Sequence, residues 1–345
     1  MIFVLIKEFP WLQGSRKIVC MKRLCLFAGY DAGGMIQDYV AHLLAGISRL
    51  SEVYCCFEVG STIGAGVQKL GNLAKEVHFT NHGKYDFGSW SFLLSRIDDD
   101  TLAQCDELIL MNDSIYGPLF DLGAVFSNME AHDCDFWGMS SSQEVVPHLQ
   151  SYFLVFRNRV LRDRSFRGFF ACVEKERSKL DVVVKYEIGL SKTLTGLGYS
   201  YRSFWQSKSP GNPTKDWMQA VDSGVPFIKC SLLSNFQFSI ESESIARMPD
   251  VCAESGYPFT LVDDHLRSKR LRFDQIVVRQ LLFSRRLNVW REANYFYSAQ
   301  KVAAKLLLSS LIASFNFGVL CLVRLRKLVS VPRSQDGQRD AAGIS

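Results

Sequence analysis

The chain alternates short apolar runs with segments of helical periodicity, and this alternation constrains its fold more than any other feature. Strand-like runs occur at Leu24–Ala28, Glu52–Phe57, Glu76–Thr80 and Leu108–Met111. Between the first two lies Met35–Leu50, whose apolar residues recur at helical spacing. Strand, helix and strand at this spacing predict right-handed βαβ units. We therefore expect an α/β fold with a mostly parallel sheet flanked by helices.

Composition sets broad limits on domains, compartment and partners. The 345 residues suffice for one large domain or two smaller ones, and a net charge of +5 is too small to indicate nucleic acid as the main partner. The ten cysteines include no Cys-x-x-Cys pair, which is typical of reduced thiols in a cytosolic protein rather than of a zinc site. Met1–Ile6 is too short for a secretory signal, and residues 1–20 are either an upstream extension or a gene-start artefact.

Three small oxygen-bearing residues, Asn112, Asp113 and Ser114, directly follow the fourth predicted strand. Ligands of open α/β sheets bind outside the carboxyl ends of the strands, so we expect this triplet at a binding crevice. Carboxylate and amide oxygens suit the hard cations that accompany phosphates, which makes Asp113 a candidate ligand for Mg²⁺ or Mn²⁺. The alternative is that the triplet forms an Asx-turn or caps the next helix.

A second polar segment, Asn81–Trp90, follows the third predicted strand and is expected to be a loop. Its two glycines allow the backbone to approach a ligand closely. Its aromatic residues can stack on a base or a sugar, or they wall the core. The chain lacks both the dinucleotide fingerprint Gly-x-Gly-x-x-Gly and the nucleophile motif Gly-x-Ser-x-Gly, which argues against a dehydrogenase or a hydrolase.

The last third of the chain differs in character from residues 21–235, which we predict to form the main domain. Residues 236–329 are expected to be helical, and residues 330–345 form a polar, disordered tail. Leu306–Val323 holds no charged residue and has a basic residue on either side. We expect it to be a shallow interfacial membrane helix. A core or oligomer helix is the second interpretation, and a membrane span is the third. The basic cluster Arg267–Arg291 is either a solvated face or a surface for anionic lipid or phosphate.

Five motifs that occur in order between Arg23 and Leu233 resemble the rhamnan synthesis protein F family of bacterial polysaccharide glycosyltransferases. They are Tyr85–Trp90, Asn112–Pro118, Phe136–Gly138, His148–Phe153 and Glu187–Leu194. The resemblance implies a GT-A-like fold and transfer of a sugar, typically rhamnose from a deoxythymidine-diphosphate donor, to a growing surface glycan. The acceptor would be lipid-linked or polymeric, and the protein would lie on the cytoplasmic face of the inner membrane. The usual metal-binding motif has two acidic residues, whereas this chain has Asn112 and Asp113, which leaves metal dependence open.

Glycosyl transfer with inversion requires a base that deprotonates the acceptor hydroxyl. Glu187 is the first candidate, because we expect it to open a helix behind a loop, and helix capping is its alternative role. His148 is the second candidate, and it could instead hydrogen-bond a phosphate or pair within the fold. Gln150 and Ser151 are candidates for the acceptor side. The residues expected to bind the nucleotide sugar are Asn81, Gly83, Tyr85, Asp86, Asn112, Asp113 and Ser114.

A second function is compatible with the same sequence. A non-catalytic, membrane-associated subunit that binds a glycan or a nucleotide and organises other enzymes would also suit the degenerate Asn112-Asp113 motif. The basic, apolar C-terminal region fits that role equally well. A sugar-transfer assay separates the two functions, because only the enzyme releases the nucleotide.

Overall fold

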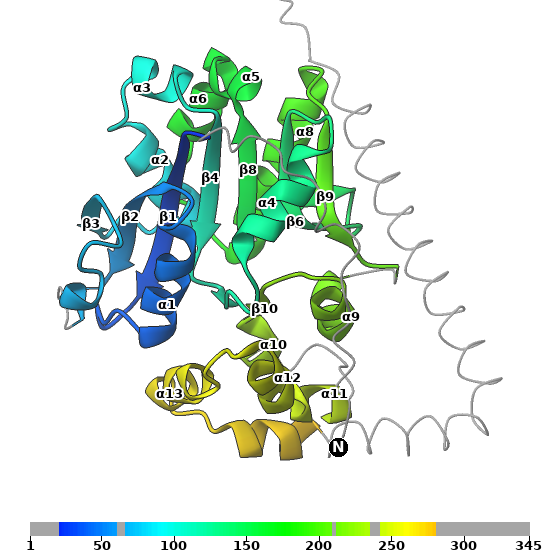
Figure 1. Cartoon of the computed structure of the whole chain (residues 1–345). Coiled ribbons are helices and arrows are strands. Elements are labelled where there is room, and N and C mark those ends of the chain that lie inside the picture. The colour runs from blue at the N-terminus through cyan, green and yellow to red at the C-terminus, as the bar shows by residue number, and fades with distance from the viewer. Residues whose placement is uncertain (1–20, 61–65, 209–211, 235–241, 281–345) are drawn as a thin grey trace, which may run out of the picture. The chain divides into compact units, whose positions relative to one another are not determined.

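The computed structural model describes residues 21–60, 66–208, 212–234 and 242–280 (Figure 1). They lie within one compact unit that extends to Leu281. The predictions for residues 1–20, 306–323 and 330–345 fall outside the described residues. Within the described ranges, no helix is both long and apolar enough to cross a membrane.

The unit is built around an eight-stranded sheet in the order β3-β2-β1-β4-β8-β6-β7, in which β6 also pairs with β9. Strands β1 to β4 are parallel, and β9 runs parallel to β6. Strand β8 is antiparallel to both β4 and β6. The strands are β1 (Arg23–Asp31), β2 (Glu52–Val59), β3 (Glu76–Thr80), β4 (Glu107–Asn112), β6 (Phe136–Ser142), β7 (His148–Leu149), β8 (Phe153–Arg157) and β9 (Tyr201–Gln206). The predicted α/β class, a mostly parallel sheet flanked by helices, is confirmed.

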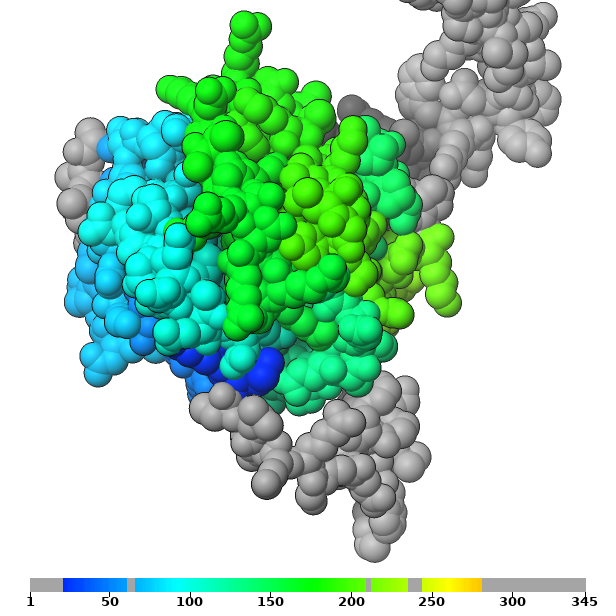
Figure 2. Space-filling view, turned by 90° about the horizontal axis from the view of Figure 1, so that it is seen from above, coloured from blue at the N-terminus to red at the C-terminus, as the bar shows by residue number. Residues whose placement is uncertain are grey.

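Helices cover both faces of the sheet (Figure 1). Side chains alternate between the faces of a strand, so Cys25 and Phe27 of β1 pack with α1 and α4, whereas Leu24 and Leu26 pack with α2, α6 and α8. Figure 2 looks onto the end where β1 begins, and there the cyan and green segments lie side by side. The helical segments of this part are α1 (Asp38–Ile47), η1 (Val67–Lys69), α2 (Tyr85–Leu94), α3 (Asp99–Ala103), α4 (Leu122–Glu130), α5 (Asn158–Leu161), α6 (Arg164–Ala171), α7 (Lys179–Val182), η2 (Val183–Ile188) and α8 (Gly189–Gly196).

A second, smaller layer lies at the carboxyl ends of β1 to β4 (Figure 1). Here β5 (Ile115–Tyr116) pairs antiparallel with β10 (Ile228–Lys229). Buried residues of α12 and α13, among them Cys252, Val262 and Leu266, belong to the same apolar cluster as α1. The helical segments of this layer are η3 (Pro213–Asp216), α9 (Trp217–Asp222), α10 (Ser231–Ser234), α11 (Ser242–Ala246), α12 (Met248–Ser255) and α13 (Thr260–Ser268). The domain division at residue 235 stays a prediction.

Two local predictions are wrong, and both concern candidate site residues. The expected loop Asn81–Trp90 ends at Lys84, because α2 begins at Tyr85. Trp90 of this helix is buried in the protein core, and its indole N–H donates to the carbonyl oxygens of Leu26 and Met111 at 3.0 and 3.3 Å. Apolar residues at helical spacing therefore override the turn signals of this stretch.

Glu187 does not open a helix. It lies within η2, a π-helical segment that joins α7 to α8 without a break. Ser178, nine residues earlier, caps the start of α7 by accepting a hydrogen bond from the backbone N–H of Asp181. The capping role considered for Glu187 is therefore wrong. Single π-helical turns are frequent at functional sites.

Candidate active site

The Asx-turn considered for the triplet after β4 is present, and it orients Asn112. The Asn112 Oδ1 atom accepts hydrogen bonds from the backbone N–H of Ser114 at 3.1 Å and from its hydroxyl at 2.6 Å. The Nδ2 group of Asn112 donates to Asp86 Oδ2 at 2.7 Å. The turn thus joins the end of β4 to the first turn of α2, and it brings three of the predicted site residues into one hydrogen-bonded group.

Asp113 lies on the other side of this edge, towards α1 and α13. Its Oδ2 accepts a hydrogen bond from the backbone N–H of Tyr30 at 2.7 Å, and its carbonyl oxygen accepts one from the Tyr39 hydroxyl at 2.9 Å. The side chain helps to line a small, partly open pocket, together with Tyr30, Tyr39, His265 and Lys269. Asp113 is therefore neither deep in the core nor fully exposed.

Burial weakens the acidity of both aspartates at this edge. Burial, reinforced by the charge of Asp86, raises the pKa of Asp113 to about 7 although the Tyr30 N–H opposes the shift. Burial likewise raises the pKa of Asp86 to about 6, against the attraction of Lys179 and the hydrogen bond from Asn112. Glu187 and Glu58 add to the rise at Asp86. Asp86 thus interacts electrostatically with both Asp113 and Glu187 and connects the two halves of the site.

Glu187 and His148 form a pair beside β7, the last strand in the sheet order, in which His148 is buried and Glu187 is half-buried. The distance from His148 Nε2 to Glu187 Oε1 is 3.4 Å. His148 Nδ1–H donates to the carbonyl oxygen of Val146 at 2.8 Å, which leaves Nε2 directed at Glu187. Ser151 donates to Glu187 Oε2 from its backbone N–H at 3.1 Å and also from its hydroxyl. Residues from β7, the turn before β8 and η2 therefore converge on one carboxylate.

The two members of this pair hold each other in their charged forms. Burial by itself would raise the pKa of Glu187, but His148, Lys229 and Ser151 together hold it below its usual range. Burial would lower the pKa of His148, yet the hydrogen bond to Glu187 and the Val146 carbonyl raise it. The pair therefore favours an ionised Glu187 and a more basic His148 than usual.

The remaining predicted residues are placed less centrally. Gln150 is buried, and its Oε1 accepts a hydrogen bond from the Ser140 hydroxyl at 2.8 Å. Asn81 is exposed and donates from Nδ2 to the Gly60 carbonyl at 3.2 Å. Gly83 adopts a φ of +67° and donates its N–H to Glu58 Oε1 at 2.6 Å. Tyr85 is exposed at the start of α2. The structure gives no contact between Asn81 or Tyr85 and the Glu187 pair.

Several residues of the site were missed in the sequence. Lys229 interrupts the apolar segment Phe227–Leu233, and a charge in such a run was the available signal. Lys269 belongs to the basic cluster, and its Nζ lies 3.8 Å from Asp31 Oδ2. Glu58 ends a buried strand with a carboxylate, a signal equivalent to that of Asp113.

The residues at this edge could contribute to a cation site only in part. Within the described ranges, no three His, Cys, Asp or Glu side chains are grouped as a metal site would need. Mg²⁺ in phosphate-transferring sites takes one or two protein carboxylates and completes its shell with phosphate oxygens and water. Asp113 fits the role of a single carboxylate of this kind, and metal binding by Asp113 stays a prediction.

The strand order, with a parallel half ending at β4 and an antiparallel β8 beside it, agrees with the predicted GT-A-like fold. Residues 60–307 match the family described as rhamnan synthesis protein F. The chain therefore belongs to the rhamnan synthesis protein F family. The matched region begins later than the resemblance seen in the sequence, which begins at Arg23, and it continues beyond the end of that resemblance at Leu233.

Solved structures that match the chain include S. aureus TarS and a glycosyltransferase of Streptococcus pneumoniae. S. aureus TarS is 12% identical with a TM-score of 0.34, over 58% of this chain and 38% of TarS. TarS residues 1–349 in complex with UDP are 10% identical with a TM-score of 0.34, over 70% of this chain and 73% of that one. The glycosyltransferase GlyE of Streptococcus pneumoniae TIGR4 is 13% identical with a TM-score of 0.37, over 73% and 64%. None of the curated proteins matches the chain. The chain thus spans little more than a third of full TarS.

Proposed function

We propose that this protein is a glycosyltransferase that moves a sugar from a nucleotide-diphosphate donor to a growing surface polysaccharide. Rhamnose or a related deoxysugar is the donor sugar that the family description suggests. The observation that carries the proposal is the convergence of the Glu187–His148–Ser151 group and the Asp86–Asn112–Ser114 group at one edge of the sheet. TarS, one of the structural neighbours, has been crystallised with UDP and with UDP-GlcNAc.

In this proposal Glu187 is the base that accepts the proton of the acceptor hydroxyl. The lowered pKa of Glu187 keeps it ionised at neutral pH, and Ser151 and His148 fix the direction of its carboxylate. A carboxylate in this role supports inversion at the anomeric carbon, because the acceptor attacks from the face opposite to the leaving diphosphate. His148 acts as a positioning residue that holds the charge of Glu187. Gln150 and Ser151 line the acceptor side.

The donor binds at the carboxyl edge of β4 in the same proposal. Asp86, Asn112 and Ser114 form the hydrogen-bonded wall of this site, and Asp113 faces the adjoining pocket. Gly83 and Tyr85 lie at the nucleotide side, where the positive φ of Gly83 brings a backbone N–H close to Glu58. A divalent cation, when bound at Asp113, would neutralise charge on the leaving diphosphate.

The function is tested by incubating the purified full-length protein with radiolabelled dTDP-rhamnose and a lipid-linked glycan acceptor. We expect label in the lipid fraction together with an equal amount of released dTDP. UDP-GlcNAc and dTDP-glucose in parallel reactions define the donor sugar. Tight binding of a nucleotide sugar without release of any nucleotide, across several acceptors, would support the non-catalytic subunit instead.

We expect the apolar segment Leu306–Val323 to attach the protein to the inner face of the membrane. A protein that ends near Lys301 should therefore become more soluble and lose sedimentation with vesicles that contain anionic lipid. The segment supplies apolar surface for the interface, and the neighbouring basic residues attract anionic headgroups. Vesicles of neutral lipid serve as the control. Equal sedimentation of the full-length and the shortened protein would refute this attachment.

A further inference from the structure

Lys229 is brought to the candidate active site by a strand pair far from it in sequence. In the pairing of β10 with β5, Lys229 lies opposite Ile115, the residue that follows Ser114. The next residue, Cys230, donates its backbone N–H to the Ser114 carbonyl at 2.8 Å. The backbone of Lys229 is therefore anchored directly beside the turn after β4.

The half-buried ammonium group of Lys229 lies close enough to Glu187 and Asp86 for their charges to act on it. Its Nζ is 4.9 Å from the centre of the Tyr152 ring, a cation–π contact. Glu187 and Asp86 attract it over a longer range, and Lys179 repels it. Within the described part of the chain, the structure gives this ammonium no ion pair or hydrogen bond. Burial lowers the pKa of Lys229 accordingly.

A half-buried ammonium that has no paired anion carries a cost in a folded protein, because it loses part of its hydration. The negative charges of Glu187 and Asp86 do not fully balance the positive charge of Lys229, because Lys179 adds a second positive charge to the same region. The charges of Lys179 and Lys229 both act on the site: Lys179 lowers the pKa of Asp86, and Lys229 lowers the pKa of Glu187, at the edge where ligands of α/β sheets bind. A bound anion would supply the missing partner, and Lys is a frequent point-charge ligand of phosphate.

We propose that Lys229 binds the diphosphate of the nucleotide-sugar donor and stabilises the negative charge that develops on it as the sugar departs. The inference rests on the proposed function, since it assumes a diphosphate donor at this edge. Lys229 places a fixed positive charge where charge develops, so its interaction strengthens in the transition state. The face of the Tyr152 ring contacts the ammonium group and helps to hold it in place.

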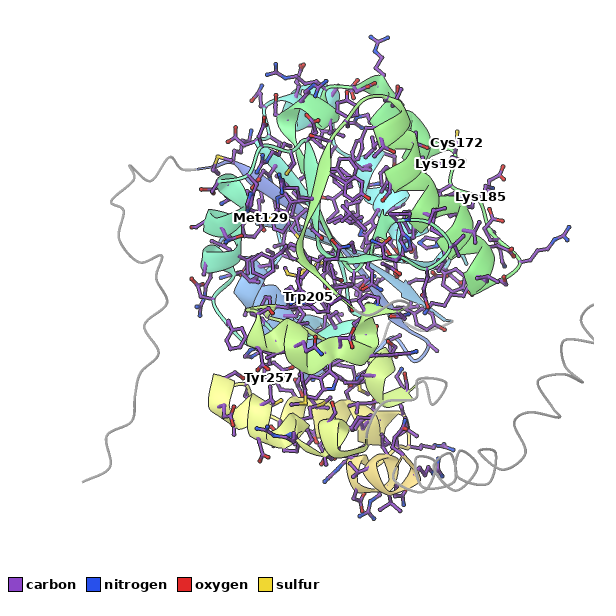
Figure 3. The ribbon with its side chains drawn as sticks, turned by 90° about the vertical axis from the view of Figure 1, so that its right-hand side faces the viewer. Met129, Cys172, Lys185, Lys192, Trp205 and Tyr257 are labelled. Atoms are coloured by element: carbon purple, nitrogen blue, oxygen red, sulfur yellow. The ribbon has the colours of Figure 1, made fainter. Side chains whose placement is uncertain are left out.

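The test is calorimetric titration of the full-length protein with dTDP and UDP, and with thymidine and uridine, each with and without Mg²⁺. Lys229→Met should weaken diphosphate binding about 10- to 100-fold, the range for a charge-assisted contact, and leave nucleoside binding unchanged. Lys229→Arg, which keeps the charge, should retain part of the affinity. The control is Lys192→Met on the outer side of α8, where Lys192 is exposed (Figure 3), and it should change neither titration.

Folding is controlled in the same variants by thermal melting. Lys229→Met should melt no lower than the wild type, because an apolar side chain of similar length replaces a half-buried charge. Unchanged diphosphate binding by Lys229→Met overturns the inference, and so does an equal loss of diphosphate and nucleoside binding. If the wild type binds no nucleoside diphosphate at all, the proposed donor is wrong and the inference falls with it. The wild-type titration therefore tells the two failures apart.

Discussion

Replacement of Glu187 by Gln is expected to lower kcat for sugar transfer by about 10²- to 10⁴-fold, the usual contribution of a positioned general base. Glutamine keeps the size of the side chain, and its amide oxygen can still accept the Ser151 N–H that now lies 3.1 Å from Glu187. It cannot take a proton from the acceptor hydroxyl. The melting temperature should therefore change little, and the loss should fall on kcat rather than on donor binding.

A second readout distinguishes this role from a structural one. The charge of Glu187 raises the pKa of His148, so Glu187→Gln should lower the pKa of His148, as measured by NMR of its ring protons. Glu174→Gln is the matched control, because Glu174 is exposed and pairs with Lys185 at 3.4 Å outside the site. We expect it to change neither the activity nor the titration of His148. Full activity of Glu187→Gln would show that the base lies elsewhere.

Replacement of Asp113 by Asn is expected to have opposite effects on activity and on stability. Burial and the charge of Asp86 raise the pKa of Asp113 from 3.8 to about 7 in the folded protein. Between these values the folded state binds more protons than the unfolded state, so stability falls as the pH rises through this window and stays low above it. Asparagine removes the cost of ionising a buried group. We expect it to raise the free energy of unfolding at pH 8 by about 1–4 kcal/mol and to change it little at pH 4.

The same variant should lower sugar transfer by about 10²-fold or more, because a neutral amide replaces the carboxylate that faces the donor pocket. Urea unfolding at pH 4 and pH 8, in buffer with EDTA, measures the stability difference without a bound cation. The exposed Asp133→Asn serves as the control and should shift stability little at either pH. An Asp113→Asn protein that is less stable than the wild type at pH 8, or that keeps full activity, would contradict this role of Asp113.

Local patterns in the sequence were sufficient to predict features that depend on a single helix or strand. The run Glu76–Thr80 is a strand with the predicted bounds, because Val77 and Phe79 alternate with polar residues, a pattern typical of strands. Asp98 is followed by Asp99 and Asp100, a pattern typical of a helix start, and it caps α3: its Oδ1 accepts the N–H of Thr101 at 2.6 Å. The helix over Tyr85–Leu94 was missed, because glycine and aromatic residues were interpreted as a binding loop while their packing on β1 was not visible in the sequence.

Contacts within the candidate site could not be predicted in this way. Glu187 and Ser151 are 36 residues apart, and Asp86 and Asn112 are 26 apart. Their meeting depends on the order of the strands and on the direction of β8, and both are set by pairing between distant segments. Glu187 and His148 were therefore predicted as alternative bases, whereas the structure shows that the two side chains form a pair.

The sequence by itself determined the α/β class, the polar edge after β4 and the membership of the rhamnan synthesis protein F family. These depend on local periodicity and on short motifs, which are properties of neighbouring residues. Only the tertiary structure decided that Lys229 lies beside Ser114 and that His148 faces Glu187. The physical reason is that a side chain's charge and burial depend on the groups that folding brings around it, and those groups come from distant parts of the chain.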